Sequence, residues 1–480
     1  MDVSADVERV TEWRMPAAGL DLHLERVGRR VRDSVTDAIR DAIRSGRLAP
    51  GARLPSSRSL ATDLGVARNT VARAYADLVT EGWLTSQHGS RTLVSQRAAD
   101  VARSVANPPR QGGTRRLDHD LRPGRPDVSS FPRSEWSRAV KRALDTAPSD
   151  AFGYADPYGR PELRHALAQY LARARGVRAR PCTIIVCSGA AEGLSLIAGA
   201  LAEQRVSSVA VEEFGLPTQW ASLNRAEIDC PPLRVDSGGA DVTALGDMAE
   251  TGGVLLTAAH QFPLGVTLSR ERRAAVIEWA RRTDAVIIED DYDGEFRYAG
   301  EPVGALQGAD PDHVIYMGTV SKSLAPGLRL GWLVVPERLV ETVARQKGEM
   351  AETSGFVDQL TMAEFIMSGS YDRHLRTMRA QYRRRREQLV AAVAKSSPNS
   401  TVTGDPAGLH VMLALAGGGE SELSRQLAWR RLGVEGLDRF RHPDTHSERD
   451  GLVVGYASPA LSAWSSALDA LTGLLPEGPR

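Results

Sequence analysis

Apolar side chains recur at helical spacing over the first hundred residues. Between residues 27 and 45, valine, alanine and isoleucine return every three or four positions, which predicts an amphipathic helix ending at Gly46. The serine-rich segment Leu54–Arg58 is expected to cap a second helix that ends at Gly65, and a third begins near Ala67. Two short helices joined by a tight glycine-containing turn are typical of a helix-turn-helix, whose second helix enters the major groove of DNA.

A hairpin and a tether are expected after these helices. Two short apolar segments flank Gln87–Arg91, whose basic tip could form a wing. Residues 98–120 have no apolar period, and Asn107–Thr114 contains two prolines and two glycines, which predicts an extended linker. We therefore expect a DNA-binding domain at residues 22–97, a linker at 98–120 and a larger body at 121–480.

The body alternates short apolar runs with helical stretches. This alternation predicts an α/β fold with a mostly parallel sheet, whose sites lie at the carboxyl ends of the strands. The expected buried strands are Thr183–Cys187, Ser208–Glu212, Gly253–Thr257, Ala285–Glu289 and Val314–Met317.

Composition narrows the class of protein. A chain of 480 residues is expected to form two or three domains, and no apolar run approaches the roughly 18 residues needed to span a bilayer. The N-terminus lacks the apolar stretch of a signal peptide, and three cysteines are too few for a disulfide framework or a zinc site. We expect a cytoplasmic protein without a metal.

Charge is unevenly distributed although the formal net charge is zero. Residues 22–97 contain 13 arginines and seven acidic residues, so the rest of the chain carries an excess of acidic residues. A small basic module on an acidic body suggests that only the module touches a polyanion. The run Arg383–Arg386 in the body is interpreted as a solvated helix face rather than a second DNA site.

Lys322 is conspicuous because only four of the 60 basic residues are lysine. Arginine can replace lysine as a surface charge, but a guanidinium cannot form a Schiff base with an aldehyde. Lys322 follows the apolar run Val314–Met317 and lies among serines, glycines and Arg329, as a phosphate-bearing aldehyde cofactor would require. The alternative is an ordinary loop lysine that faces solvent.

Three further clusters follow expected strands. Ser188–Gly193 would place backbone N–H groups at a helix N-terminus, where a phosphate binds well. His260–Pro263 follows the third strand, and Glu289–Arg297 has five acidic residues within seven positions. A buried carboxylate in that acidic run could hold a pyridine nitrogen protonated, although a solvated acidic loop is the alternative.

The basic module resembles the winged-helix domain of the GntR family, on the segments Gly51–Arg58, Val66–Val71 and Gly82–Gly89. The resemblance implies contacts to phosphates, base edges and the minor groove, made by Arg58, Arg68, Asn69, Thr70, His88 and Gly89. One departure is Ala67, where the family often has serine or threonine, so a helix cap and a possible phosphate contact are lost.

The body resembles the fold-type I aminotransferases, which use pyridoxal phosphate (PLP). The segments His260–Pro263, Glu289–Asp293 and Ser321–Arg329 look like those of the MocR/GabR regulators, which fuse a GntR-like module to such a body. The resemblance implies an α/β fold: a winged helix, then a large aminotransferase-like domain with a mostly parallel sheet, then a smaller C-terminal α+β domain.

The resemblance also implies roles for individual residues. Lys322 would form the aldimine with the cofactor, and Asp290 would pair with its ring nitrogen. Tyr292 and Gln261 would lie near the phenolic oxygen of the ring. The phosphate would be held by Ala190, Ala191, Ser321, Arg329 and, from the neighbouring subunit of a head-to-tail homodimer, Tyr154.

The sequence departs from the family pattern at two positions near the expected cofactor and effector. Leu216 replaces the tyrosine that usually stacks on the cofactor ring, and Thr218 replaces an arginine that some relatives carry. A second carboxylate-binding arginine is expected near residues 437–441, and we favour Arg439 over Arg441.

Three functions are compatible with these residues. The favoured one is a PLP-dependent transcriptional regulator that binds DNA and senses an amine, an amino acid or PLP through Lys322. The second is an active aminotransferase that carries a DNA-binding module, and the third is a DNA-binding protein whose body is a scaffold without cofactor.

Overall fold

The structure is a computed structural model with two compact units, Met1–Thr114 and Arg115–Arg480. Each unit is described by itself. Across the described part of the chain, no helix combines the length and the apolar character that a bilayer crossing needs. The structure describes residues 12–13, 24–25, 31–44, 47–87, 91–95, 117–154, 156–300, 303–348, 355–415 and 419–476.

In its described residues, the first unit contains three helices and a hairpin, as predicted, and in addition a short antiparallel pair of strands, Glu12–Trp13 with Leu24–Glu25. Val35, Leu60, Val71 and Leu78 are buried in one apolar core. The side chain of Ser56 caps the second helix by accepting a hydrogen bond from the Ser59 N–H, whereas the third helix has no such cap at Ala67. The elements are β1 (Glu12–Trp13), β2 (Leu24–Glu25), α1 (Val31–Arg44), α2 (Ser57–Asp63), α3 (Arg68–Thr80), β3 (Leu84–Gln87) and β4 (Arg91–Val94).

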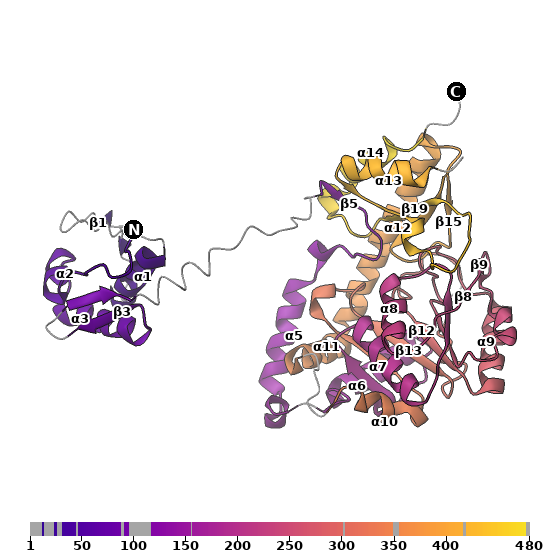
Figure 1. The fold of residues 1–480 in the computed structure, drawn as a ribbon, viewed down its shortest axis with the longest axis horizontal. Coiled ribbons are helices and arrows are strands. Elements are labelled where there is room, and N and C mark those ends of the chain that lie inside the picture. The colour runs from indigo at the N-terminus through magenta and orange to yellow at the C-terminus, as the bar shows by residue number, and fades with distance from the viewer. Residues whose placement is uncertain are drawn as a thin grey trace, which may run out of the picture. The chain divides into compact units, whose positions relative to one another are not determined.

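A seven-stranded sheet forms the centre of the body (Figure 1). Its order is β6-β14-β13-β12-β11-β7-β8, and only β14 runs antiparallel to its neighbours. The mostly parallel sheet is therefore confirmed. The strands are β6 (Ile184–Cys187), β7 (Val209–Glu212), β8 (Pro232–Leu233), β11 (Gly253–Leu256), β12 (Val286–Asp290), β13 (Val314–Thr319) and β14 (Gly331–Val334).

Helices cover both faces of this sheet because its strands are apolar on both sides. Ile185 and Cys187 pack into a cluster with α7, α8 and α10, whereas Ile184 and Val186 pack into another with α6, α11 and α12. The strand β11 packs against α9 through Val254. The helices are α5 (Arg133–Thr146), α6 (Pro161–Arg175), α7 (Ala190–Glu203), α8 (Pro217–Arg225), α9 (Arg270–Thr283), α10 (Glu337–Arg345), α11 (Phe356–Met367) and α12 (Ser370–Ser396).

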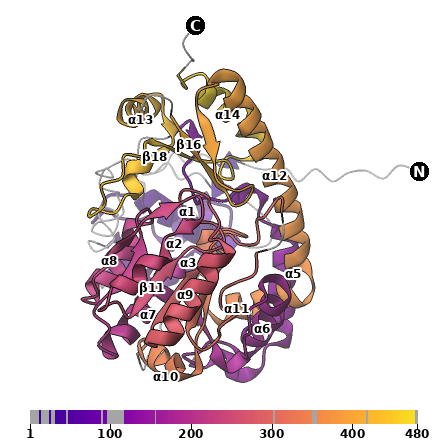
Figure 2. The same cartoon turned by 90° about the vertical axis from the view of Figure 1, so that its right-hand side faces the viewer.

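A smaller C-terminal part is built on a four-stranded sheet of order β15-β16-β19-β18. The long helix α12 runs from this part along the side of the large one (Figure 2). The bounds are β15 (Thr401–Thr403), β16 (His410–Ala414), β18 (Glu435–Gly436), β19 (Gly451–Gly455), α13 (Glu420–Trp429) and α14 (Trp464–Thr472). Four short strands complete the body: β5 (His119–Asp120), β9 (Val235–Asp236), β10 (Gly239–Ala240) and β17 (Leu432–Gly433).

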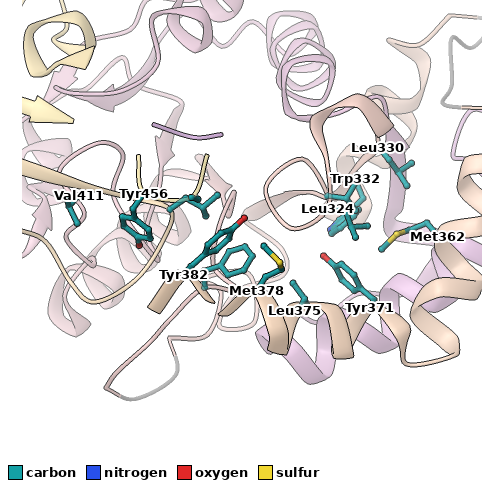
Figure 3. Close-up of a cluster of buried hydrophobic side chains, with 14 of the residues drawn as sticks. Leu324, Leu330, Trp332, Met362, Tyr371, Leu375, Met378, Tyr382, Val411 and Tyr456 are labelled. Atoms are coloured by element: carbon teal, nitrogen blue, oxygen red, sulfur yellow. The ribbon is translucent and has the colours of Figure 1, made fainter. Parts of the chain in front are cut away.

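One apolar cluster joins the two parts of the body. Figure 3 shows Tyr371, Met378 and Tyr382 of α12 lying between Trp332 of the large sheet and Tyr456, which follows β19 of the small one. The interpretation of Arg383–Arg386 as a solvated helix face is right for Arg383 and Arg384, which are exposed, and wrong for Arg385. Arg385 is 2% exposed and pairs with the equally buried Asp127 at 3.2 Å, because α12 faces the core at that position.

Candidate functional site

The carboxyl ends of the large sheet open into a cavity of about 530 Å³. Asp290 ends β12, Lys322 follows β13, and the N-terminus of α7 follows β6, so three neighbouring parts of the sheet converge on it. The expected site residues that line this cavity are Lys322, Asp290, Tyr292, Ala190, Ala191, Ser321, Arg329 and Arg439.

The Lys322 amine lies inside this cavity. Its Nζ donates a hydrogen bond to the Gly124 carbonyl oxygen at 2.6 Å. Burial lowers the pKa of Lys322, while the carboxylates of Asp290 and Asp293 oppose that shift. A lysine that faces open solvent would show neither feature, so that alternative is wrong. A lowered pKa increases the fraction of neutral amine, the form that attacks an aldehyde.

Asp290 presents one free acceptor to the cavity. Gln219 Nε2 donates to Asp290 Oδ2 at 2.6 Å, whereas the buried Oδ1 has no partner among the described residues. Burial raises the pKa of Asp290 to about 7, and the Gln219 hydrogen bond and the Lys322 charge act in the opposite direction. A buried unpaired oxygen is costly, so Oδ1 is suited to accept a hydrogen bond from a ligand N–H.

An anion cradle lies in the same cavity. The helix α7 begins directly after Gly189, whose φ of +117° belongs to a conformation that residues with a side chain rarely adopt. Ala190 and Ala191 form the N-terminus of this 14-residue helix and line the cavity. Ser321 and Arg329 line the same cavity. A helix N-terminus beside a hydroxyl and a guanidinium is suited to a phosphate.

The acidic run Glu289–Glu295, which spans the end of β12 and the loop after it, is buried, and its interpretation as a solvated loop is wrong. None of its five carboxylates is more than 9% exposed. Besides Asp290, each has a defined partner from another part of the body. The pairs are Glu289 with the Leu306 N–H, Asp291 with Arg175, Asp293 with His260, and Glu295 with Tyr170.

Two expected residues do not line the cavity. The Gln261 amide donates to the Phe214 carbonyl at 2.9 Å and accepts from the Leu264 N–H at 3.0 Å, so it holds its own turn, and Phe262 lines the cavity instead. Tyr154 is fully exposed on the surface, which leaves its expected role toward a neighbouring subunit a prediction.

The outer end of the cavity is lined by Leu216, Thr218 and Arg439. Arg439 is largely exposed and lies 3.1 Å from Glu435, whereas Arg441 donates to the Arg449 carbonyl and lies over the Phe214 ring. Of these two arginines, Arg439 therefore faces the cavity.

Sequence reasoning missed several groups that line the cavity, three of which form hydrogen bonds with Lys322, Asp290 or Thr257. Gln219, Gly124 and Glu212 come from α8, from the start of the body and from the end of β7. Burial raises the pKa of Glu212 to about 7, and its carboxylate accepts from the Thr257 N–H at 3.2 Å. Glu212 could have been noticed, since it ends an apolar strand, and Gln219 directly follows Thr218, one of the positions where the family resemblance had already placed the site; nothing near Gly124 in the sequence signals a site.

The expected DNA-contacting residues lie on α2 and α3. Arg58, Arg68 and Asn69 are exposed, and Thr70 is half-buried in the first turn of α3. His88 and Gly89 lie outside the described residues. An exposed basic N-terminus on the second helix of a helix-turn-helix is where base and phosphate contacts are made.

Two protein families match the two units. The model described as "Bacterial regulatory proteins, gntR family" matches residues 31–94, and "Aminotransferase class I and II" matches residues 127–435. Among solved structures, an archaeal alanine:glyoxylate aminotransferase is similar at a TM-score of 0.66 and 22% identity, over 83% of this chain and 94% of that one. A kynurenine aminotransferase from Pyrococcus horikoshii has a TM-score of 0.67 and 21% identity, over 80% and 94%.

Whole-length relatives carry both parts. "Probable rhizopine catabolism regulatory protein MocR" of Rhizobium meliloti is 32% identical over 86% of this chain and 87% of its own. "HTH-type pyridoxine biosynthesis transcriptional regulator PdxR" of Corynebacterium glutamicum is 32% identical over 86% and 89%.

The cofactor of the aminotransferase family is PLP, and the cavity offers the groups that PLP requires: a buried amine, an unpartnered carboxylate oxygen and a helix N-terminus. The chain thus belongs to the MocR-type transcriptional regulators, in which a GntR-family DNA-binding domain precedes a PLP-dependent aminotransferase-like domain.

Proposed function

We propose that this regulator senses a small amine, an amino acid or PLP itself through Lys322, and that this event changes how its winged helix binds an operator. The observation that supports it best is the meeting of Lys322, Asp290 and the α7 N-terminus in one cavity. The names of two relatives, tied to rhizopine catabolism and to pyridoxine biosynthesis, suit an amine or a B6 compound as signal. Such a regulator acts in the cytoplasm.

The residues of the cavity have separate tasks. Bound PLP would supply an aldehyde that captures primary amines. Lys322 provides the competing amine, and Asp290 keeps a proton on the ring nitrogen through its unpartnered Oδ1. The α7 N-terminus, Ser321 and Arg329 hold the phosphate, while Arg439 binds the carboxylate of an amino-acid effector.

The DNA response follows from a change of population. An effector that displaces the Lys322 amine shifts the body between conformations only as far as its affinity differs between them. We infer a head-to-tail homodimer that presents two winged helices, in which exposed Tyr154 reaches the phosphate of the neighbouring cavity. Operator binding measured with and without PLP and candidate amines tests the proposal; identical affinities would contradict it.

An active aminotransferase remains the second candidate, because the cavity keeps both Lys322 and Asp290. Mixing the protein with amino donors and a keto acid separates the two. Catalytic turnover would support the enzyme. Spectral change without sustained product formation would support the regulator.

Gln219→Leu is expected to raise the pKa of Asp290 further above about 7, because the hydrogen bond that stabilises the carboxylate is lost. A charge-assisted hydrogen bond corresponds to about one to two pH units. PLP binding should therefore weaken near neutral pH, where Asp290 becomes protonated, and recover only above about pH 9. Binding titrations over this pH range test the shift. Gln219→Glu should shift the profile further, and Ser222→Ala, on the same helix, should not.

Arg68→Ala is expected to weaken operator binding by about 1–3 kcal/mol if the side chain contacts a base edge. Fluorescence anisotropy with the operator and with an unrelated duplex measures this. Equal weakening on both duplexes would make Arg68 a phosphate contact. Arg138→Ala, an exposed residue paired with Glu135 in the body, is the control.

A further inference from the structure

A second cavity, also of about 530 Å³, is lined by the loop that follows β12. It is bounded by the C-terminal half of α6, by the first turns of α12 and by Asp293–Gly300. Among the residues that the structure describes, none lines both this cavity and the Lys322 cavity. Its volume is that of a small-molecule site.

Guanidinium groups with unused donors converge on this second cavity. Arg376 has no hydrogen-bond or ion-pair partner among the described residues. Arg379 uses its Nε for the Glu295 carbonyl at 2.9 Å, which leaves both terminal nitrogens available. The Nε of Arg297 is buried, and no described group accepts from it. Two more lining arginines, Arg173 and Arg175, are already paired with Asp372 and Asp291.

The carboxylates that line the second cavity do not pair with these three arginines, although Arg297 lies 3.9 Å from Asp405, outside the lining, and donates to the Thr267 hydroxyl at 3.2 Å. Asp293 pairs with His260 at 3.0 Å, and Glu295 accepts from the Tyr170 hydroxyl at 3.2 Å. Arginine on a helix is ordinarily a solvated charge, but these three come from α12 and from the loop after β12 and meet around one hollow. Arg376 and Arg379 form no ion pair among the described residues, so their positive charges repel one another, and their planar forks match carboxylate and phosphate oxygens.

The second cavity is joined to the first by one short segment. Tyr292 lines the Lys322 cavity, and the next residue, Asp293, lines the second. His260 Nδ1 lies 3.0 Å from both the Tyr292 hydroxyl and Asp293 Oδ2, so one imidazole links the two side chains. A ligand that moves Asp293 would therefore move Tyr292.

We propose that the second cavity binds a small dianion, a phosphate compound or a dicarboxylate, and that its occupancy alters the cofactor cavity through Asp293, His260 and Tyr292. This site is separate from the Lys322 site, so a dianion bound there would be a second ligand that regulates the protein. Binding there does not depend on the proposed reaction at Lys322.

The test titrates inorganic phosphate, pyrophosphate and succinate separately into the full-length PLP-bound protein and follows binding by calorimetry. In the PLP-bound protein, the phosphate of the cofactor occupies the anion-binding groups of the Lys322 cavity, so the added anions are not expected to bind there. We expect one site per chain for at least one probe, weakened about tenfold or more in the Arg376→Ala/Arg379→Ala variant. Arg383→Ala, on the same helix but paired with Glu387, should bind like the parent. A preference for succinate over the phosphates, or the reverse, assigns the ligand class.

Several results would overturn the proposal. Absence of binding for all three probes, or equal binding by the double variant, would remove the site. Binding without any change in the cofactor absorbance or in its pH profile would remove the coupling. Operator binding that fails to respond to amines, in a PLP-bound protein that still binds an anion and loses that binding in the Arg376→Ala/Arg379→Ala variant, would mark a failure of the proposed sensing reaction alone, so the two failures are distinguishable.

Discussion

Replacing Lys322 with alanine should abolish covalent attachment of PLP to the protein. Its Nζ lies in the same cavity as Asp290 and the α7 N-terminus, and burial lowers its pKa, so it is placed to form the bond. After borohydride reduction, the intact mass of the parent should increase by one cofactor per chain. The variant should show no increase and no bound visible absorbance band, and its operator binding should no longer respond to amines.

The control separates this effect from a general loss of lysine. Lys141→Ala removes a largely exposed amine that pairs with Asp145, so cofactor attachment should be unchanged. Lys322→Arg keeps the positive charge but cannot form the bond, and should fail like alanine. An undiminished mass increase in Lys322→Ala would show that another amine holds the cofactor.

The strand ends were predictable because each buried strand is a short uninterrupted apolar run. The expected runs Ala285–Glu289 and Val314–Met317 differ from β12 and β13 by one or two residues. In a parallel sheet, residues that follow such runs share one edge. The sequence alone therefore predicts that Asp290 and Lys322 lie at the same edge of the sheet.

Contacts between distant segments could not be predicted in this way. Gln219 reaches Asp290 across 71 positions, and Arg385 meets Asp127 across 258. The local sequence pattern does not predict such pairs. An arginine on a polar helix face is predicted to be solvated, because its partner lies far away in the sequence. Gln261 shows a further limit: it was expected near the cofactor ring, but it does not line the cavity, and its amide hydrogen-bonds within the turn that it belongs to.

The buried ion pair between Arg175 and Asp291, a member of the acidic run, should dominate the stability of the body near the site. Arg175 and Asp291 are 6% and 1% exposed at their side chains, and they form two hydrogen bonds of 2.6 and 3.0 Å. Asp291 also accepts from the Tyr316 hydroxyl at 2.8 Å. Removing one member leaves an unpaired charge in a buried place, which costs far more than the pair itself contributes.

Arg175→Met is accordingly expected to lower the free energy of unfolding of the body by about 3–5 kcal/mol. Denaturant titration followed by tryptophan fluorescence measures this, since Trp332 lies in the adjoining core. Arg175→Met/Asp291→Asn should recover part of the loss, because no lone charge remains. Arg142→Ala, at an exposed pair with Glu364, should cost about 1 kcal/mol or less. If the double variant were no more stable than Arg175→Met, the loss would come from packing of the arginine side chain rather than from the stranded carboxylate.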